Sequence, residues 1–199
     1  PVSSKANWDS YWDKANKIVN STTGELVWDY NRKVVLAKSA KTQGVIGFAG
    51  GYTYDLPGAT ITVNTPFVSL LLTPLDNKPL IDSRHILITA LAQNKQYGAV
   101  YGPNGTNLTA LGGEPLLMEP VQATITFKGL PLTSAKVVDV YGVPTSQQIQ
   151  RNGNTITIDG RYATYYYEVI SAPPVTADIV DVTPDPRGTS VSSMTITFS

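Results

Sequence analysis

The sequence contains no cysteine and a single histidine, His85. Without cysteine there is no disulfide framework, no thiolate nucleophile and no cysteine-based zinc site. One histidine is also too few for the usual zinc sites, which take several His or Cys ligands. We therefore expect neither thiol chemistry nor transition-metal chemistry from this chain.

Charge is also scarce. Fifteen Lys and Arg balance fifteen Asp and Glu, and charged residues make up only 15% of the chain, against about 25% in an average soluble domain. A surface without excess positive charge offers no electrostatic basis for binding nucleic acid or an anionic membrane. No run reaches the ~18 consecutive apolar residues of a membrane span. We predict no nucleic-acid or membrane partner, and a polar surface that suits neutral, hydroxyl-rich ligands.

The hydrophobic pattern predicts an all-β fold. From Glu25 onward it has period two, is rich in β-branched residues and is interrupted regularly by turn residues, as in an antiparallel, jelly-roll-like β-sandwich. The expected strands span residues 25–30, 33–38, 43–49, 59–63, 67–73, 84–92, 121–127, 136–141, 146–151, 154–158 and 163–170. The strand at 84–92 is apolar on both faces, which predicts a central position.

Three local features refine this prediction. Residues 7–20 are expected to form one short amphipathic helix, because Trp8, Tyr11, Trp12, Ala15, Ile18 and Val19 recur at spacings of three and four. Asn152-Gly153 predicts a type I′ hairpin turn, and with Asp159-Gly160 it predicts a three-stranded meander over 146–170. The stretches 50–58 and 102–113, rich in Gly, Pro and Asn, are expected to be loops.

The chain starts at Pro1 rather than Met, and its β pattern stops at Pro173-Pro174. We therefore expect a piece of a longer protein in three parts. Residues 1–22 form an N-terminal helix and linker, and residues 23–172 the sandwich module. Residues 173–199 are a Pro-rich linker followed either by the first strands of a truncated Ig-like domain or by extra strands of the main sandwich.

Five segments share their order and spacing with a known kind of module. They are Thr23–Tyr30, Lys41–Phe48, Leu75–Ala92, Gly113–Val121 and Thr164–Val169. Together they resemble the accessory, carbohydrate-binding-module-like β-sandwich of multidomain secreted bacterial glycoside hydrolases. The tail from Ala177 is similar to bacterial Ig-like repeats. The resemblance implies a secreted or cell-surface protein in which the neighbouring catalytic domain of the same chain is a partner and carries the chemistry.

Catalytic groups are sparse. His85 lies in an apolar strand, and no Gly-x-Ser-x-Gly motif offers it a serine. Glu114 and Glu119 are the nearest approach to a glycosidase carboxylate pair, but both precede proline and we expect them to be structural. We predict no catalytic residue, no enzyme activity of this domain and no cofactor. A structural calcium ion, which needs only oxygen ligands, remains open.

Tyrosine is the aromatic residue in excess, with eleven against three Trp and four Phe. A ring with a polar tip can stack on a sugar and bond its hydroxyls. The candidate carbohydrate-binding residues are therefore the tyrosines of the expected loops and nearby amides, namely Tyr52, Tyr54, Tyr97, Tyr101, Asn94, Gln96 and Asn104. Two functions stay open, a module that binds neutral polysaccharide and a structural spacer that braces a glycosidase barrel against Ig-like domains.

Overall fold

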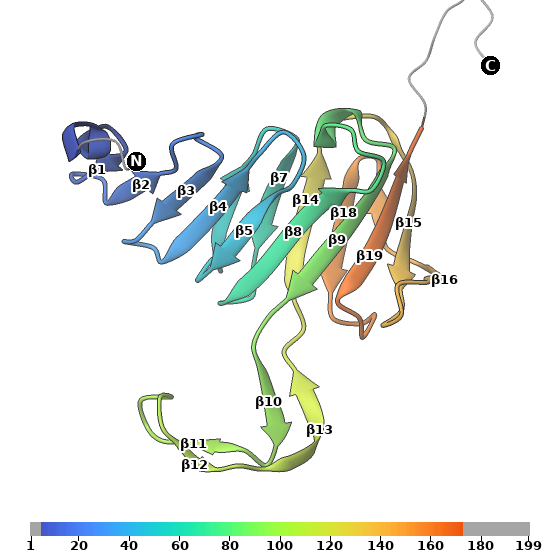
Figure 1. Cartoon of the computed structure of the whole chain (residues 1–199). Coiled ribbons are helices and arrows are strands. Elements are labelled where there is room, and N and C mark those ends of the chain that lie inside the picture. The colour runs from blue at the N-terminus through green and yellow to red at the C-terminus, as the bar shows by residue number, and fades with distance from the viewer. Residues whose placement is uncertain (1–4, 173–199) are drawn as a thin grey trace, which may run out of the picture.

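The computed structural model describes residues 5–172, and Figure 1 shows their arrangement. The larger of its two main sheets has ten antiparallel strands. Their order across the sheet is β1 (Trp12–Asp13), β2 (Ile18–Asn20), β3 (Leu26–Asp29), β4 (Val34–Lys38), β5 (Gln43–Gly47), β8 (Val68–Pro74), β9 (His85–Leu91), β19 (Tyr166–Ser171), β15 (Leu132–Val138) and β16 (Pro144–Gln148). As the two apolar faces of the segment predict, β9 is a central strand between β8 and β19.

The smaller sheet has five antiparallel strands and lies behind the larger sheet in Figure 1. Its order is β17 (Arg151–Asn152), β18 (Thr155–Asp159), β14 (Gln122–Phe127), β7 (Ala59–Val63) and β6 (Tyr52–Asp55). Two strand pairs stand apart from both sheets. They are β10 (Asn94–Tyr97) with β13 (Gly113–Met118), and β11 (Val100–Tyr101) with β12 (Leu108–Ala110).

One hydrophobic core joins the two main sheets. Alternate residues of the strands that form the core are buried, as in Ile61 of β7, Ile125 of β14, Leu70 of β8 and Ile88 of β9, which are all 0% exposed. Period-two burial on facing sheets is the packing that the sequence pattern requires. The predicted all-β class with antiparallel strands is therefore confirmed, and the arrangement is sandwich-like.

The helix predicted over residues 7–20 is wrong. The segment forms a short 3₁₀ helix, η1 (Lys5–Ser10), and then the β1–β2 hairpin, in which Trp12 pairs with Val19. The Asp13 carboxylate accepts bonds from the backbone N–H of Asn16 at 2.9 Å and from its side-chain amide at 2.6 Å. Such local bonds of Asp and Asn compete with a helix, and Lys17 takes a positive φ of 59° that ends any helical turn.

The meander predicted over residues 146–170 is also wrong, although its strands exist. The strand β16 pairs with β15 and β19 with β9 and β15, both in the larger sheet, whereas β17 and β18 belong to the smaller one. Asn152 pairs with Thr155, so the turn residues are Gly153 and Asn154. Of these only Gly153 has a positive φ, at 56°, which is the type II′ position for glycine.

Both predicted loops contain strands. Residues 52–55 form β6 at the edge of the smaller sheet, and residues 108–110 form β12. A second short 3₁₀ helix, η2 (Leu80–Asp82), precedes β9. Within residues 5–172 no helix has the length and apolar character needed to cross a bilayer. The expected linker and Ig-like strands of 173–199 lie outside the described residues.

Candidate binding site on a projecting arm

The strands β10 to β13 form an arm that projects from the sheets between the end of β9 and the start of β14 (Figure 1). Asn94 pairs with Met118 and Gln96 with Leu116 in its first part. The Glu119 N–H donates to the Gln93 carbonyl oxygen at 2.8 Å and closes the base of the arm. All residues of β10, β11 and β12 are exposed. The arm therefore has no core of its own.

A bend in the arm brings its outer hairpin back toward its base. The β10–β13 register shifts between Gln96 and Tyr97. Opposite this bulge, Gly112 has a φ of +70°, and a Cβ added there would lie 2.4 Å from the Tyr97 carbonyl oxygen. Only glycine fits this close approach. The outer hairpin is closed by the Gly102 N–H, which donates to the Asn107 carbonyl oxygen at 2.8 Å.

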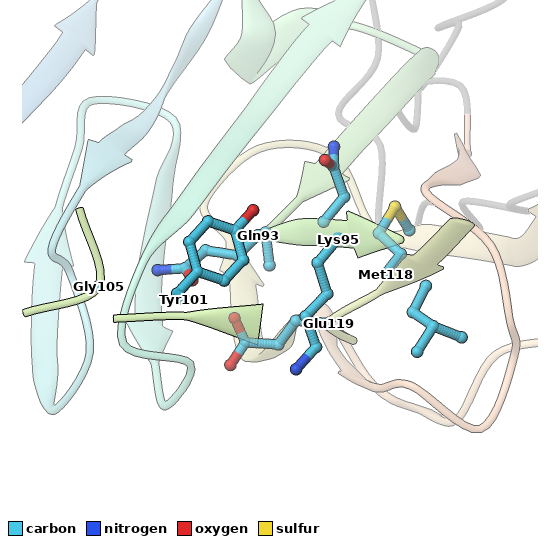
Figure 2. A pocket seen from close by; sticks show the side chains of 9 residues that line it. Gln93, Lys95, Tyr101, Gly105, Met118 and Glu119 are labelled. Carbon is cyan, nitrogen blue, oxygen red and sulfur yellow. The ribbon is translucent and has the colours of Figure 1, made fainter. Parts of the chain in front are cut away.

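An open cleft of about 820 Å³ lies at the foot of the arm, and we call it the arm-base cleft. Its lining residues are Ala92, Gln93, Asn94, Lys95, Tyr101, Gly105, Leu117, Met118 and Glu119. Figure 2 shows Gly105 and Tyr101 on one side and Met118 on the other, with Gln93, Lys95 and Glu119 between them. Tyr101 is 46% exposed, so its ring is accessible to a ligand.

The chemistry of this cleft is that of a polar binding site with one aromatic surface. Gln93 and Asn94 carry amides that both donate and accept, and the Tyr101 hydroxyl does the same. Lys95 and Glu119 contribute one charge of each sign, so their formal charges cancel. Leu117 and Met118 add apolar surface. Such a cleft can hold a neutral molecule with many hydroxyl groups.

The structure divides the predicted site residues into two groups. Asn94 and Tyr101 line the arm-base cleft. Tyr97 and Gln96 lie further along β10, both exposed, and Asn104 lies in the outer hairpin beside Gly105. Tyr52 and Tyr54 lie on β6 of the smaller sheet. Five of the seven residues are therefore on the arm and two are not.

The two tyrosines of β6 differ from each other. Tyr54 is only 6% exposed, and its hydroxyl donates to the Ala49 carbonyl oxygen at 3.3 Å. Burial raises the pKa of Tyr54 above its ordinary value. Tyr52 is 45% exposed, and the Arg32 guanidinium lies 4.9 Å from its ring centroid. The Tyr54 ring thus belongs to the core, while Tyr52 is a surface aromatic already in contact with a cation.

Sequence reasoning missed most of the cleft lining, namely Gln93, Lys95, Leu117, Met118 and the placement of Glu119. The segment Asn94–Tyr97 is four exposed residues without apolar alternation, so it carries no strand signal. Once its pairing with β13 is known, the pairing of Lys95 with Leu117 places these two lining residues beside each other. Only the pairing of the strands could have revealed this site.

The other residues that could act in catalysis or bind a metal ion lie outside the arm-base cleft. The His85 Nε2 atom lies 2.8 Å from Glu168 Oε1, whereas the nearby Ser83 hydroxyl donates to Asp76 and to the His85 backbone. In the described part of the chain no group of three or more His, Asp or Glu residues could hold a metal ion. Comparison with family models, curated proteins and solved structures finds no match for this chain.

Proposed function

We propose that the chain is a non-catalytic accessory module of a secreted or cell-surface polysaccharide-degrading enzyme, and that it binds neutral polysaccharide in the arm-base cleft. The observation that carries this proposal is the exposed ring of Tyr101 in one open cleft with Asn94 and Glu119. An aromatic ring with a polar tip stacks on the C–H face of a sugar. Amide and carboxylate groups accept hydrogen bonds from its hydroxyls.

The charge of the cleft also suits a neutral polymer. The cleft is open to solvent, and the charges of Lys95 and Glu119 offset each other. The enzyme context rests on the five segments that resemble accessory modules of glycoside hydrolases. The proposal takes the two facing sheets as a jelly-roll-like sandwich, which the shared core supports.

The placement of the acidic residues and of His85 supports a non-catalytic role. Glu119 lines the arm-base cleft, whereas Glu114 is not among the lining residues, so the two carboxylates do not face one cleft as a glycosidase pair does. His85 Nε2 is paired with the Glu168 carboxylate, and the Ser83 hydroxyl donates to Asp76 and to the His85 backbone, so these groups do not form a serine–histidine pair.

Affinity electrophoresis against soluble β-glucans, xylans, mannans and galactans tests the proposal. The chain should be retarded by at least one of these polymers, with a Kd on the order of micromolar to millimolar, because shallow polar sites gain little per contact. Tyr101→Ala should weaken that binding roughly three- to tenfold through loss of stacking. Tyr52→Ala removes a similarly exposed tyrosine from the smaller sheet. This control should leave the affinity for the polymer unchanged.

A structural spacer that braces a catalytic domain is the second candidate, and the arm itself favours it. Apolar side chains along the arm are strongly exposed, with Leu111 at 74%, Leu116 at 62% and Val100 at 52%. An isolated two-stranded ribbon is marginally stable in water, so a neighbouring domain that covered these side chains would stabilise it. Absence of retardation by every polymer would favour this function over polysaccharide binding.

A further inference from the structure

A second cleft, of about 510 Å³, lies on the outer face of the larger sheet, away from the core. Its floor comes from β9 and β19, where His85 and Glu168 alternate with the buried Ile86 and Val169. Period-two alternation therefore points both side chains outward. We call this the outer cleft. It shares no lining residue with the arm-base cleft.

The floor of the outer cleft is a fixed hydrogen-bonding pair. Glu168 Oε1 lies 2.8 Å from His85 Nε2, and the Glu168 side chain is only 15% exposed. Among the described residues, Glu168 Oε2 has no hydrogen-bond partner. Every fully buried side-chain oxygen or nitrogen in this part of the chain does have one. Oε2 therefore keeps contact with solvent. A carboxylate oxygen held in one orientation and open to the cleft is a ready acceptor for a hydroxyl group.

One wall of the cleft is a short, well-organised loop over residues 139–143. Asp139 Oδ1 accepts bonds from the N–H groups of Tyr141 at 2.9 Å and Val143 at 2.8 Å. Gly142 completes the turn with a φ of +85°, and its N–H donates to the Asp139 carbonyl oxygen at 3.1 Å. This loop holds Tyr141 at 89% exposure. Its ring therefore contributes little to packing among the described residues.

The charges around the floor favour a neutral ligand. A free anion would meet the Glu168 carboxylate. The apolar side chains that make up most of the lining, among them Leu75, Leu87 and Val140, would desolvate any charged ligand at a cost in free energy. None of the described residues that line the cleft is Ser, Thr or Cys, so it offers binding groups and no hydroxyl or thiol nucleophile.

We propose that the outer cleft binds one neutral pyranose unit of a glycan. Two adjacent hydroxyls of the sugar bond to Glu168 Oε2 and to His85 Nδ1, the ring nitrogen that is not paired with Glu168, and its C–H face stacks on Tyr141. An aromatic ring stacks on the apolar C–H face of a sugar, and fixed acceptors beside it bond to the sugar hydroxyls. The cleft thus offers a partner to both the apolar and the polar surface of the sugar. The site is separate from the arm-base cleft, and either can bind without the other.

An NMR titration of the ¹⁵N-labelled full chain tests this proposal. The probes are methyl β-D-glucopyranoside, methyl α-D-mannopyranoside and methyl β-D-galactopyranoside, which differ in the orientation of adjacent hydroxyls. At least one should shift the amide signals of residues 85–87, 140–143 and 166–168 saturably, with a Kd on the order of millimolar. Absence of such shifts with all three sugars would overturn the proposal.

Two variants and a control make the test specific. Tyr141→Ala, at a side chain exposed enough to leave folding intact, should weaken binding at least fivefold. Glu168→Gln retains an oxygen for His85 and should also weaken it, because the charge-assisted bonds are lost. Tyr97→Ala removes an exposed tyrosine of the arm and should change nothing at these amides. Binding unaltered by Tyr141→Ala, or shifts confined to residues 93–119, would refute the outer cleft, and the second result would still support the arm-base cleft.

Discussion

The side chain of Gln43 in the larger sheet accepts a hydrogen bond from the backbone N–H of Gly58, which precedes β7 in the smaller sheet, at 2.8 Å. Gln43 is 2% exposed, and its amide nitrogen also donates to the Ser39 carbonyl oxygen at 3.0 Å. A buried amide with both ends satisfied fixes how the two sheets meet at this end of the core.

Replacing Gln43 with leucine, which has a similar volume, should destabilise the fold by about 2–4 kcal/mol. The substitution leaves the Gly58 N–H and the Ser39 carbonyl without their partner, and each unsatisfied buried group costs about 1–3 kcal/mol. Chemical denaturation followed by tryptophan fluorescence measures the change. Gln122→Leu, at an exposed position of β14, is the matched control and should change stability by less than about 0.5 kcal/mol. If Gln43→Leu and Gln122→Leu are equally stable, the Gln43 side chain does not help to hold the two sheets together.

The arm should be removable without loss of the fold. Because no residue from 94 to 117 belongs to the core, replacing Lys95–Leu117 with Asn-Gly should shift Tm by no more than about 3 °C. Such a two-residue turn suits the pairing of Asn94 with Met118. Differential scanning calorimetry measures the change, with Leu72→Ala as the contrast, because truncating a buried leucine costs about 2–5 kcal/mol. A larger loss of stability from removing the arm than from Leu72→Ala would show that the arm supports the core.

Sequence patterns predict where the strands lie better than they predict which sheet each strand joins. The segment from His85 to Leu91 is apolar on both faces, and it is a central strand. Period two says which residues share a face, but it does not say which sheet a strand joins. For that reason β18 and β19 were expected to be neighbours, although the Asp159-Gly160 turn carries the chain from one sheet to the other. The helix expected around Trp12 does not form because Asn16 donates hydrogen bonds from its backbone and side chain to the Asp13 carboxylate, which closes a local turn.

The candidate site was predictable only where its residues are close in the sequence. Asn94, Gln96, Tyr97 and Tyr101 lie on one arm because a single excursion of the chain carries them. Tyr52 and Tyr54 share a strand face by period two, yet only Tyr54 is buried. The difference comes from position, because Tyr52 lies at the end of an edge strand against Arg32. No sequence pattern carries that information.

Asp76 should make the fold sensitive to acid. Burial acts to raise its pKa, but hydrogen bonds from the Arg84 N–H, the Ser83 hydroxyl and the Lys78 N–H outweigh burial and hold the pKa below its ordinary value. A lowered folded-state pKa stabilises the fold above the unfolded value of about 3.9, and this stabilisation is lost as pH falls through the folded pKa.

Asp76→Asn should therefore be less stable than the natural chain at pH 7, and the difference should shrink as the pH falls from about 5 toward 2. Urea denaturation at a series of pH values measures both curves. The exposed Asp82 of η2 supplies a control, and Asp82→Asn should follow the natural chain over this range. A stability difference between Asp76→Asn and the natural chain that stays constant down to pH 2 would show that the Asp76 hydrogen bonds do not depend on its charge.

Polysaccharide binding at the foot of the arm is the central claim, and one residue-resolved measurement tests it directly. A ¹⁵N-labelled chain titrated with oligosaccharides of the β-glucan, xylan, mannan and galactan series should show saturable shifts at the amides of residues 93–95, 101 and 117–119, with no new reducing ends released. Tyr101→Ala should raise the Kd obtained from these shifts roughly three- to tenfold. If every series leaves these amides unmoved, or if the oligosaccharides are cleaved by the chain, the account is contradicted.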